Sequence, residues 1–322
     1  MKKLFILIIS ILILSFSYTN NIPRVYEDAY IKCAYETYNG MLNGKYISYY
    51  KNGQKKSEGI FENNYRKGTW TVWDSTGRLR MQRVYSDPFT FKQVIPKVST
   101  DAPVKLLNVS PYQIKYNKDN YIDNFYLEER SIMWSKRIWR QIEIKNNPVL
   151  FSKQITNAFI KILTTAEDSI SIYQENEFWN ISKTTFDSSN YEIIAYKIKE
   201  DAFFDNDRMV SESRIIGICP VIQEKKKAEI KETKELGWIY FPQIRKVLAR
   251  QTINDTILPT YVKNLDDLFF FRYFYGQIYM ESNVYTRAIN AYSKGKEIET
   301  EAERIELSLI ETEHDIWIGF TE

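Results

Sequence analysis

The residue with the most obvious capacity for chemistry is His314, which stands between two carboxylates, Glu313 and Asp315. A histidine beside acids can act as a general acid or base, or can bind a metal ion. It is the only histidine among 322 residues, and a zinc site needs three or four ligands that converge on the ion. The pattern therefore predicts a histidine that packs or caps locally, and no metal ion.

Three aspartates, Asp201, Asp205 and Asp207, resemble the start of a calcium-binding loop. The glycine that such a loop needs and the glutamate at its twelfth position are both missing, so a solvated turn is favoured. The sequence also lacks the G-x-S-x-G, P-loop and G-x-G-x-x-G patterns. We therefore predict no catalytic residue and no cofactor, and an exported enzyme is the least favoured function class.

Two segments combine large aromatic residues with arginines: residues 131–140 (SIMWSKRIWR) and residues 235–245 (ELGWIYFPQIR). Trp, Tyr and Arg carry much of the energy at protein interfaces, although core aromatics beside arginines that reach to water have the same composition. Trp134 is expected in the core, whereas Trp139 lies on another face and is the better candidate for a partner contact. The residues predicted to contact a partner are Arg137, Trp139, Arg140, Tyr240, Arg245, Tyr285 and Arg287.

The start of the chain predicts export. A short basic start, a run of apolar residues and then small residues give residues 1–17 the layout of a secretory signal peptide. An uncleaved anchor is the alternative, but a spanning helix needs about 20 apolar residues. No cysteine lies at the end of the apolar run, so contact with a membrane is expected only through a partner. Two cysteines are too few for a disulfide scaffold, but Cys33 and Cys219 could still form one bridge, and that question is left open.

The formal net charge of +3 leaves the chain close to balanced. A nucleic-acid-binding protein usually carries a basic patch or stripe. Nucleic acid is therefore not expected among the partners.

An internal repeat lies within residues 18–86. Residues 44–53 (GKYISYYKNG) align with residues 68–77 (GTWTVWDSTG). Alternating aromatic and polar residues predict strands with one buried face, and Gly53 and Gly77 predict hairpin turns. The units resemble MORN-type repeats of bacterial proteins. That resemblance implies a short β-ribbon used for docking or spacing, with contact to lipid as the less favoured use.

Residues 87–125 are expected to form an extended linker or arm, because proline disfavours helix. Both a free tether and a segment that lies along a surface fit this composition. The prolines stand at near-regular intervals: Pro88, Pro96, Pro103 and Pro111.

Residues 126–322 are typical of a mixed domain, so the expected fold class is α+β, with a β-hairpin repeat module before it. Helices are predicted at 128–145, 155–166, 242–249, 265–281 and 299–317. Strands are predicted at 170–173, 191–199, 214–221 and 238–241, with a solvated excursion at 223–234. The last helix should present acidic residues to water and turn inward Ala302, Ile305, Leu309, Thr312 and Ile316.

Five blocks in this region occur in a recognisable order. They are residues 134–140 (WSKRIWR), 214–221 (RIIGICPV), 238–249 (WIYFPQIRKVLA), 279–287 (YMESNVYTR) and 313–317 (EHDIW). In these blocks residues 126–322 resemble the GldN/PorN family, a component of the type IX secretion and gliding-motility apparatus.

The resemblance implies an assembly role and no catalysis. A member of this family is expected in the periplasm, associated with the inner face of the outer membrane. It would form a ring with an outer-membrane lipoprotein by self-association, and would connect to the periplasmic part of the inner-membrane motor. The alternative function is a periplasmic adaptor whose repeats bind an envelope ligand, either lipid or glycan.

Overall fold

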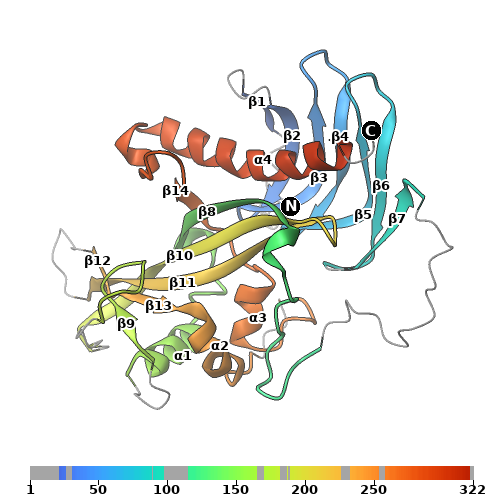
Figure 1. Ribbon diagram of the computed structural model, residues 1–322. Helices are drawn as coiled ribbons and strands as arrows, with labels where there is room; N and C mark the ends of the chain where they lie inside the picture. The colour runs from blue at the N-terminus through green and yellow to red at the C-terminus, as the bar shows by residue number, and fades with distance from the viewer. Residues whose placement is uncertain are drawn as a thin grey trace, which may run out of the picture.

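The fold was analysed in a computed structural model of the chain. It describes residues 22–26, 31–88, 90–97, 115–164, 170–181, 187, 189–225, 233–253 and 258–319. The expected signal peptide at residues 1–17 lies outside the described residues. The described part is an α+β protein with two antiparallel sheets, as Figure 1 shows.

The first sheet is a meander in which each strand pairs with the next along the chain. Its strands are β1 (Ile22–Tyr26), β2 (Ile31–Tyr38), β3 (Met41–Tyr49), β4 (Lys55–Glu62), β5 (Tyr65–Trp73), β6 (Leu79–Tyr85) and β7 (Phe91–Ile95). The expected turns are confirmed, because Gly53 and Gly77 have φ of 83° and 84°. The sheet continues past residue 86, since β7 adds a strand within the segment expected to be a linker.

The repeated aromatics of this sheet form one buried face. Tyr46, Phe61, Trp70 and Tyr85 belong to a single apolar cluster. The Trp70 ring lies directly on Gly59, where a Cβ would be 2.1 Å from a ring carbon. The glycine at this position of β4 therefore leaves the space that the indole of the next strand fills. We call β1–β7 the repeat sheet.

The second sheet has the order β14-β8-β10-β11-β13-β9, and β12 pairs with β11. Its strands are β8 (Ile132–Glu143), β9 (Ile172–Tyr173), β10 (Tyr191–Asp205), β11 (Val210–Glu224), β12 (Thr233–Glu235), β13 (Trp238–Tyr240) and β14 (Gln277–Glu281). The helices are α1 (Lys153–Thr164), α2 (Phe241–Ala249), α3 (Leu265–Phe270) and α4 (Lys296–Gly319). Short 3-10 turns lie at Glu129–Ser131, Ile144–Asn146 and Ile289–Ala291.

The expectation of a helix over residues 128–145 is wrong, because most of this segment is strand β8. It rested on Trp134, Ile138 and Ile142, which are four positions apart. That spacing places residues on one face of a helix, but also on one face of a strand, where side chains alternate. β8 lies between β10 and β14, so sheet bonds satisfy its backbone groups.

The expectation of one long helix over residues 265–281 is also wrong. The helix α3 ends at Phe270, and the chain then turns and enters strand β14. Arg272 in this turn has φ of 51°, a left-handed conformation that does not continue a right-handed helix.

The other expected elements are confirmed in type. The helices predicted at 155–166, 242–249 and 299–317 are α1, α2 and α4. The predicted strands are parts of β9, β10, β11 and β13. Most of the excursion at 223–234 lies outside the described residues.

One face of β8 and β10 carries the core of the second sheet. Towards one end of the strands, Ile142 packs in a large cluster with residues of α1, α2 and α3. Ile138, on the same face, packs instead with residues of β14 and α4. We call the face of β8 and β10 that carries Ile138 and Ile142 the inner face. Helices α1, α2 and α3 cover one part of it, and α4 covers the other.

Helix α4 ties the two sheets together. It contacts β14 of the second sheet and also β5 and β6 of the repeat sheet, across which it lies in Figure 1. Leu307 of α4 belongs to the aromatic cluster of the repeat sheet, and Trp317 packs with Val72 and Met81 of β5 and β6. Within the described residues, no helix is both long and apolar enough to cross a membrane.

Candidate partner interface

The outer face of β8 carries the first two predicted contact residues. Arg137 makes a two-pronged ion pair with Asp201 on β10, at 2.7 and 2.8 Å. Because that carboxylate accepts its hydrogen bonds, the pKa of Arg137 is raised. Trp139 is only 4 % exposed and packs with Cys219 and Trp238. In this structure Trp139 is part of a second core wall and is not presented to a partner.

Arg140 points to the inner face and is also buried. It donates to Glu200 and to Glu306 of α4, while Arg272 donates to the same Glu200 at 2.5 Å. Glu200 is fully buried, which alone would raise its pKa, but Arg272 and Arg140 together hold that pKa below its ordinary value. The predicted interface arginine therefore joins β8, β10 and α4 inside the fold.

Arg245 of α2 is buried as well. It donates through Nε and Nη2 to the two oxygens of Asp266, at 2.9 and 2.7 Å, and through Nη2 to the Ile122 carbonyl at 2.6 Å. Its guanidinium lies over the rings of Tyr121 and Phe270. Burial raises the pKa of Asp266 and the arginine opposes that rise. Arg245 thus fastens the segment around Ile122 to α2 and α3.

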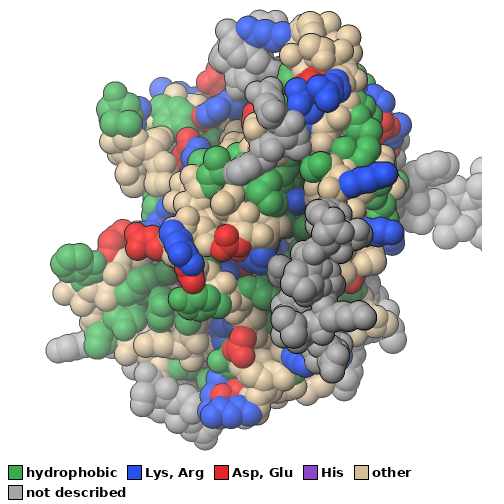
Figure 2. Space-filling model, turned by 45° about the vertical axis from the view of Figure 1, so that its right-hand side comes forward, with side chains coloured by type: hydrophobic (Ala, Val, Ile, Leu, Met, Phe, Trp, Pro, Cys, Tyr) green, Lys and Arg blue, Asp and Glu red, His purple; other side chains and the backbone are tan. Residues whose placement is uncertain are grey.

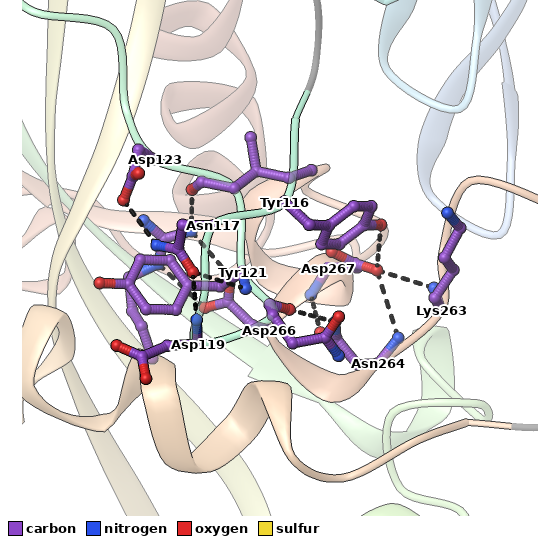
Figure 3. A network of polar contacts seen from close by, with 12 residues as sticks. Tyr116, Asn117, Asp119, Tyr121, Asp123, Lys263, Asn264, Asp266 and Asp267 are labelled. Carbon is purple, nitrogen blue, oxygen red and sulfur yellow. Dashed lines mark hydrogen bonds and ion pairs between the residues drawn. The ribbon is translucent and has the colours of Figure 1, made fainter.

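The described end of the expected arm is held along the surface of the second domain, as Figure 3 shows. The Tyr116 hydroxyl donates to Asp267 at 2.9 Å, and the Asn264 amide donates to the Asn120 carbonyl at 3.0 Å. Asn264 and Asp267 also form a capping box at the start of α3. Residues 115–125 are therefore not a free tether, while residues 98–114 lie outside the described residues.

The remaining predicted contact residues are exposed, and two of them lie in one loop after β14. Tyr285 is 70 % exposed and the neighbouring Val284 is 94 % exposed. The guanidinium of Arg287 lies 4.6 Å from the centre of the Tyr285 ring. Residues 284–292 also include the exposed Tyr292. We call this loop the β14 end of the second sheet.

Tyr240 lies at the opposite end of the same sheet, on β13 beside the edge strand β9. Its ring packs at 5.4 Å against Phe178, which in turn covers Gly217, where a Cβ would be 2.6 Å from the Phe178 ring. Next to Phe178, Trp179 is 81 % exposed, and Ile181 is 62 % exposed. We call Trp179, Ile181 and Tyr240 the β9 end. Sequence analysis missed Trp179 and Ile181; their signal was an aromatic pair within an otherwise polar turn.

Buried charges join α4 to the repeat sheet. Glu313 of α4 forms an ion pair with Arg66 of β5 at 2.5 Å, and Glu311 forms one with Lys56 of β4 at 2.8 Å. Burial would raise the pKa of Glu311, but His314 and Lys56 hold it well below its usual range. The expectation that α4 turns its acids to water is wrong for these two, because basic residues far away in sequence pair with them.

His314 packs locally, as expected. Its ring is fully buried between the rings of Trp70 and Trp317, at 5.9 and 5.4 Å. Its Nδ1 lies 3.0 Å from a Glu311 oxygen, and its Nε2 lies 3.3 Å from Nη2 of Arg66.

On the face drawn in Figure 2 no histidine is visible, and acidic and basic side chains are interspersed with hydrophobic ones.

The aspartates that resemble a calcium loop are used within the fold. Asp205 accepts the backbone N–H of Asp207 at 2.9 Å and pairs with Arg208, while Asp201 pairs with Arg137. Across the described part of the chain, no group of three or more His, Cys, Asp or Glu side chains is arranged to hold a metal ion.

Both cysteines are buried, and no disulfide joins Cys33 to Cys219. Burial raises the pKa of Cys219 to about 12. Its thiol is therefore a small core side chain beside Trp139, as its apolar surroundings in the sequence indicate.

Comparison with known proteins finds a family match within the second domain. A search of the curated proteins finds no match to this chain. The family model described as gliding motility associated protein GldN matches residues 173–318, which run from β9 to the end of α4. The match contains the exposed loop at the β14 end and the exposed residues of the β9 end. Residues 173–318 therefore match the GldN family, and this likeness covers a little under half of the chain.

Proposed function

We propose that this protein is a non-enzymatic structural subunit of a gliding-motility and type IX secretion machine, and that it assembles with copies of itself into a ring. The match of residues 173–318 to the GldN family model supports the coarser part, a component of that envelope machinery. The ring, its lipoprotein partner and its place beneath the outer membrane go further and are the proposal.

The observation that carries the proposal is the presence of two unlike apolar surfaces at opposite ends of one sheet. The β9 end exposes Trp179 and Ile181, with the exposed Glu177 beside them. The β14 end exposes Val284 and Tyr285, with Arg287 stacked on the tyrosine. Exposed aromatic and aliphatic groups beside polar residues are typical of interaction sites.

These two surfaces fit each other better than either fits itself. The acid at the β9 end and the arginine at the β14 end have opposite charges, so contact between unlike ends is attractive and contact between like ends is repulsive. Contact between unlike ends is head-to-tail, and such contacts close into a ring when the rotation between copies permits. The second sheet would then run between the two contacts made by each copy.

The lipoprotein is proposed as the link to the membrane. No cysteine stands directly at the end of the predicted export segment, so we propose that the protein reaches the outer membrane through a partner. The repeat sheet is fixed to α4 by buried ion pairs, so it would travel with the ring as one body. The periplasmic part of the inner-membrane motor is proposed to contact the assembled ring.

Mixing two cysteine variants tests the head-to-tail contact. Trp179→Cys and Tyr285→Cys are purified separately, mixed in equal amounts and oxidised mildly. The native Cys33 and Cys219 are buried and should stay silent. A covalent dimer that forms only in the mixture supports the proposal. Dimers that form within each variant alone, and no cross-linking in the mixture, would exclude a head-to-tail contact at these surfaces.

Met133→Cys is the matched control, because Met133 is exposed but lies at neither of the two ends. It should not cross-link to either partner variant. Cross-linking at the same rate as the test pair would show random collision, and would count against the proposed contact.

A further inference from the structure

A cavity of about 1150 Å³ lies between the repeat sheet, α4 and the inner face of the second sheet. Its wall on the side of the repeat sheet and α4 combines an apolar strip with four glutamates of α4, of which Glu313 is paired with Arg66 and Glu306 with Arg140. The residues of the apolar strip are Tyr35, Leu42, Phe61, Phe91, Leu307 and Ile310. Cavities of this size and lining are typical of small-molecule sites.

Two polar groups in this wall have unused hydrogen-bonding capacity. Tyr85 is 8 % exposed, and its hydroxyl has no hydrogen-bond partner among the described residues. Nε of Arg66 is also buried without a partner, although the same guanidinium pairs through Nη2 with Glu313. Both residues line the cavity. An unsatisfied buried polar group costs free energy. A ligand atom that accepts hydrogen bonds from these two donors would remove that cost.

Next to Tyr85 lies a buried arginine that has no counter-ion among the described residues. Arg83 is 2 % exposed and donates to neutral oxygens, those of Gln93 and Met209 at 2.8 and 2.7 Å, and its guanidinium also lies close to the Tyr85 oxygen. Among the described residues no carboxylate pairs with it, and a buried charge without a counter-ion is expensive. Burial raises the pKa of Tyr85 while Arg66 and Arg83 oppose that rise, so the hydroxyl keeps its proton and can donate.

We propose that this part of the cavity binds a single amphipathic anion, an acyl chain with a carboxylate head. The head would accept hydrogen bonds from the Tyr85 hydroxyl and from Nε of Arg66, and its charge would compensate Arg83. The chain would lie along the apolar strip between the repeat sheet and α4. The site is independent of ring assembly, since none of its residues belongs to the β9 or β14 end.

Calorimetric titration of the purified protein with dodecanoate, at concentrations where it is monomeric, tests the proposal. Dodecanol and acetate are titrated in parallel, because the first has the chain without the charge and the second the charge without the chain. Dodecanoate should bind at least about 10-fold more tightly than either, since a charge-assisted hydrogen bond is worth at least one decade in affinity. Equal affinity for dodecanoate and dodecanol, equal affinity for acetate, or no binding of dodecanoate, would each overturn it.

Tyr85→Phe locates the site, with Tyr196→Phe as its matched control. The Tyr196 hydroxyl is also buried and has no partner within the described part of the chain, but it lies in the core beneath α1 and does not line the cavity. Neither change should destabilise the free protein, because each removes an unsatisfied hydroxyl. Tyr85→Phe should weaken dodecanoate binding about 10-fold, and Tyr196→Phe should leave it unchanged. An unchanged affinity in Tyr85→Phe would place the binding elsewhere and refute the assignment.

A vesicle arm separates a free acyl anion from a membrane surface. Anionic phosphatidylglycerol vesicles are sedimented with the wild-type protein and with Tyr85→Phe. The cavity lies between two packed layers, so the proposal commits to a monomeric anion. Binding to vesicles by both proteins, together with no binding of dodecanoate, would contradict it.

Discussion

Arg245→Met should destabilise the protein strongly, although Arg245 was first expected to contact a partner. Arg245 and Asp266 are 6 % and 0 % exposed, and the arginine supplies both hydrogen bonds across the pair. Removing one member of a buried ion pair costs about 3–5 kcal/mol, because the other charge stays buried. The substitution also removes the hydrogen bond to the Ile122 carbonyl. We expect the free energy of unfolding to fall by about 4 kcal/mol at neutral pH.

The loss of unfolding free energy in Arg245→Met should be larger at high pH than at low pH. Burial already raises the pKa of Asp266, and without Arg245 that pKa should rise further. A carboxyl group whose folded pKa is raised contributes stability that is complete below its unfolded pKa, about 4, and is lost as the pH rises through the folded pKa. The variant should therefore be closer to the wild type at pH 4.5 than at pH 8.

Urea denaturation followed by circular dichroism at both pH values measures these quantities. Arg245→Lys is a milder variant that keeps a charge but loses the two-pronged geometry, and should cost about 1–2 kcal/mol. Arg130→Met is the surface control, because the Arg130 side chain is 83 % exposed and its pair with Glu128 should contribute under about 1 kcal/mol. A deficit below about 1 kcal/mol for Arg245→Met, or one of equal size at both pH values, would refute the reasoning.

Three further results are expected. Gly59→Ala should lower the free energy of unfolding by about 1–3 kcal/mol, because its Cβ would lie 2.1 Å from the Trp70 ring; an unchanged urea midpoint would show that the strand shifts freely. The pKa of Glu311 is lowered in the folded protein, so the stability that it contributes is present above about pH 4 and is lost as the pH falls. Glu311→Gln should therefore weaken the fall of the unfolding free energy at acid pH. An unchanged fall at acid pH would be contrary evidence. Cys33 and Cys219 are buried and form no disulfide, so a thiol reagent at pH 8 should label neither in the native protein and both in urea. Fast labelling of the native protein would contradict the packing.

Local patterns were enough to predict the repeat sheet and three of the helices. Alternation of aromatic and polar residues along β3 and β5, with glycines at the turns, predicts strands with one buried face joined by hairpins. The amphipathic spacing in α1, α2 and α4 was likewise visible without the structure.

The position of β8 could not be predicted in this way. Trp134, Ile138 and Ile142 satisfy both the helical and the strand period, so the spacing alone does not decide between them. The decision comes from pairing with β10 and β14, which are more than fifty residues away in sequence. The same pairing buries Trp139 and Arg140 on opposite faces of the sheet.

The dependence of α4 on the repeat sheet was also invisible from the sequence. The acids Glu311 and Glu313 were expected to face water, since an acidic residue usually does. Their partners Lys56 and Arg66 stand in the repeats, so the two predicted units share one buried charge network. Tyr285, which was predicted to contact a partner, is exposed, and the contact itself stays a prediction.

The most direct test of the assembly proposal is to isolate the protein from its native envelope. Tagged protein is recovered from detergent-solubilised envelopes, its partners are identified by mass spectrometry, and the particles are viewed by negative-stain microscopy. We predict one abundant outer-membrane lipoprotein and large ring-shaped particles, and loss of the rings in Trp179→Ser. A monodisperse monomer without a lipoprotein would contradict the account.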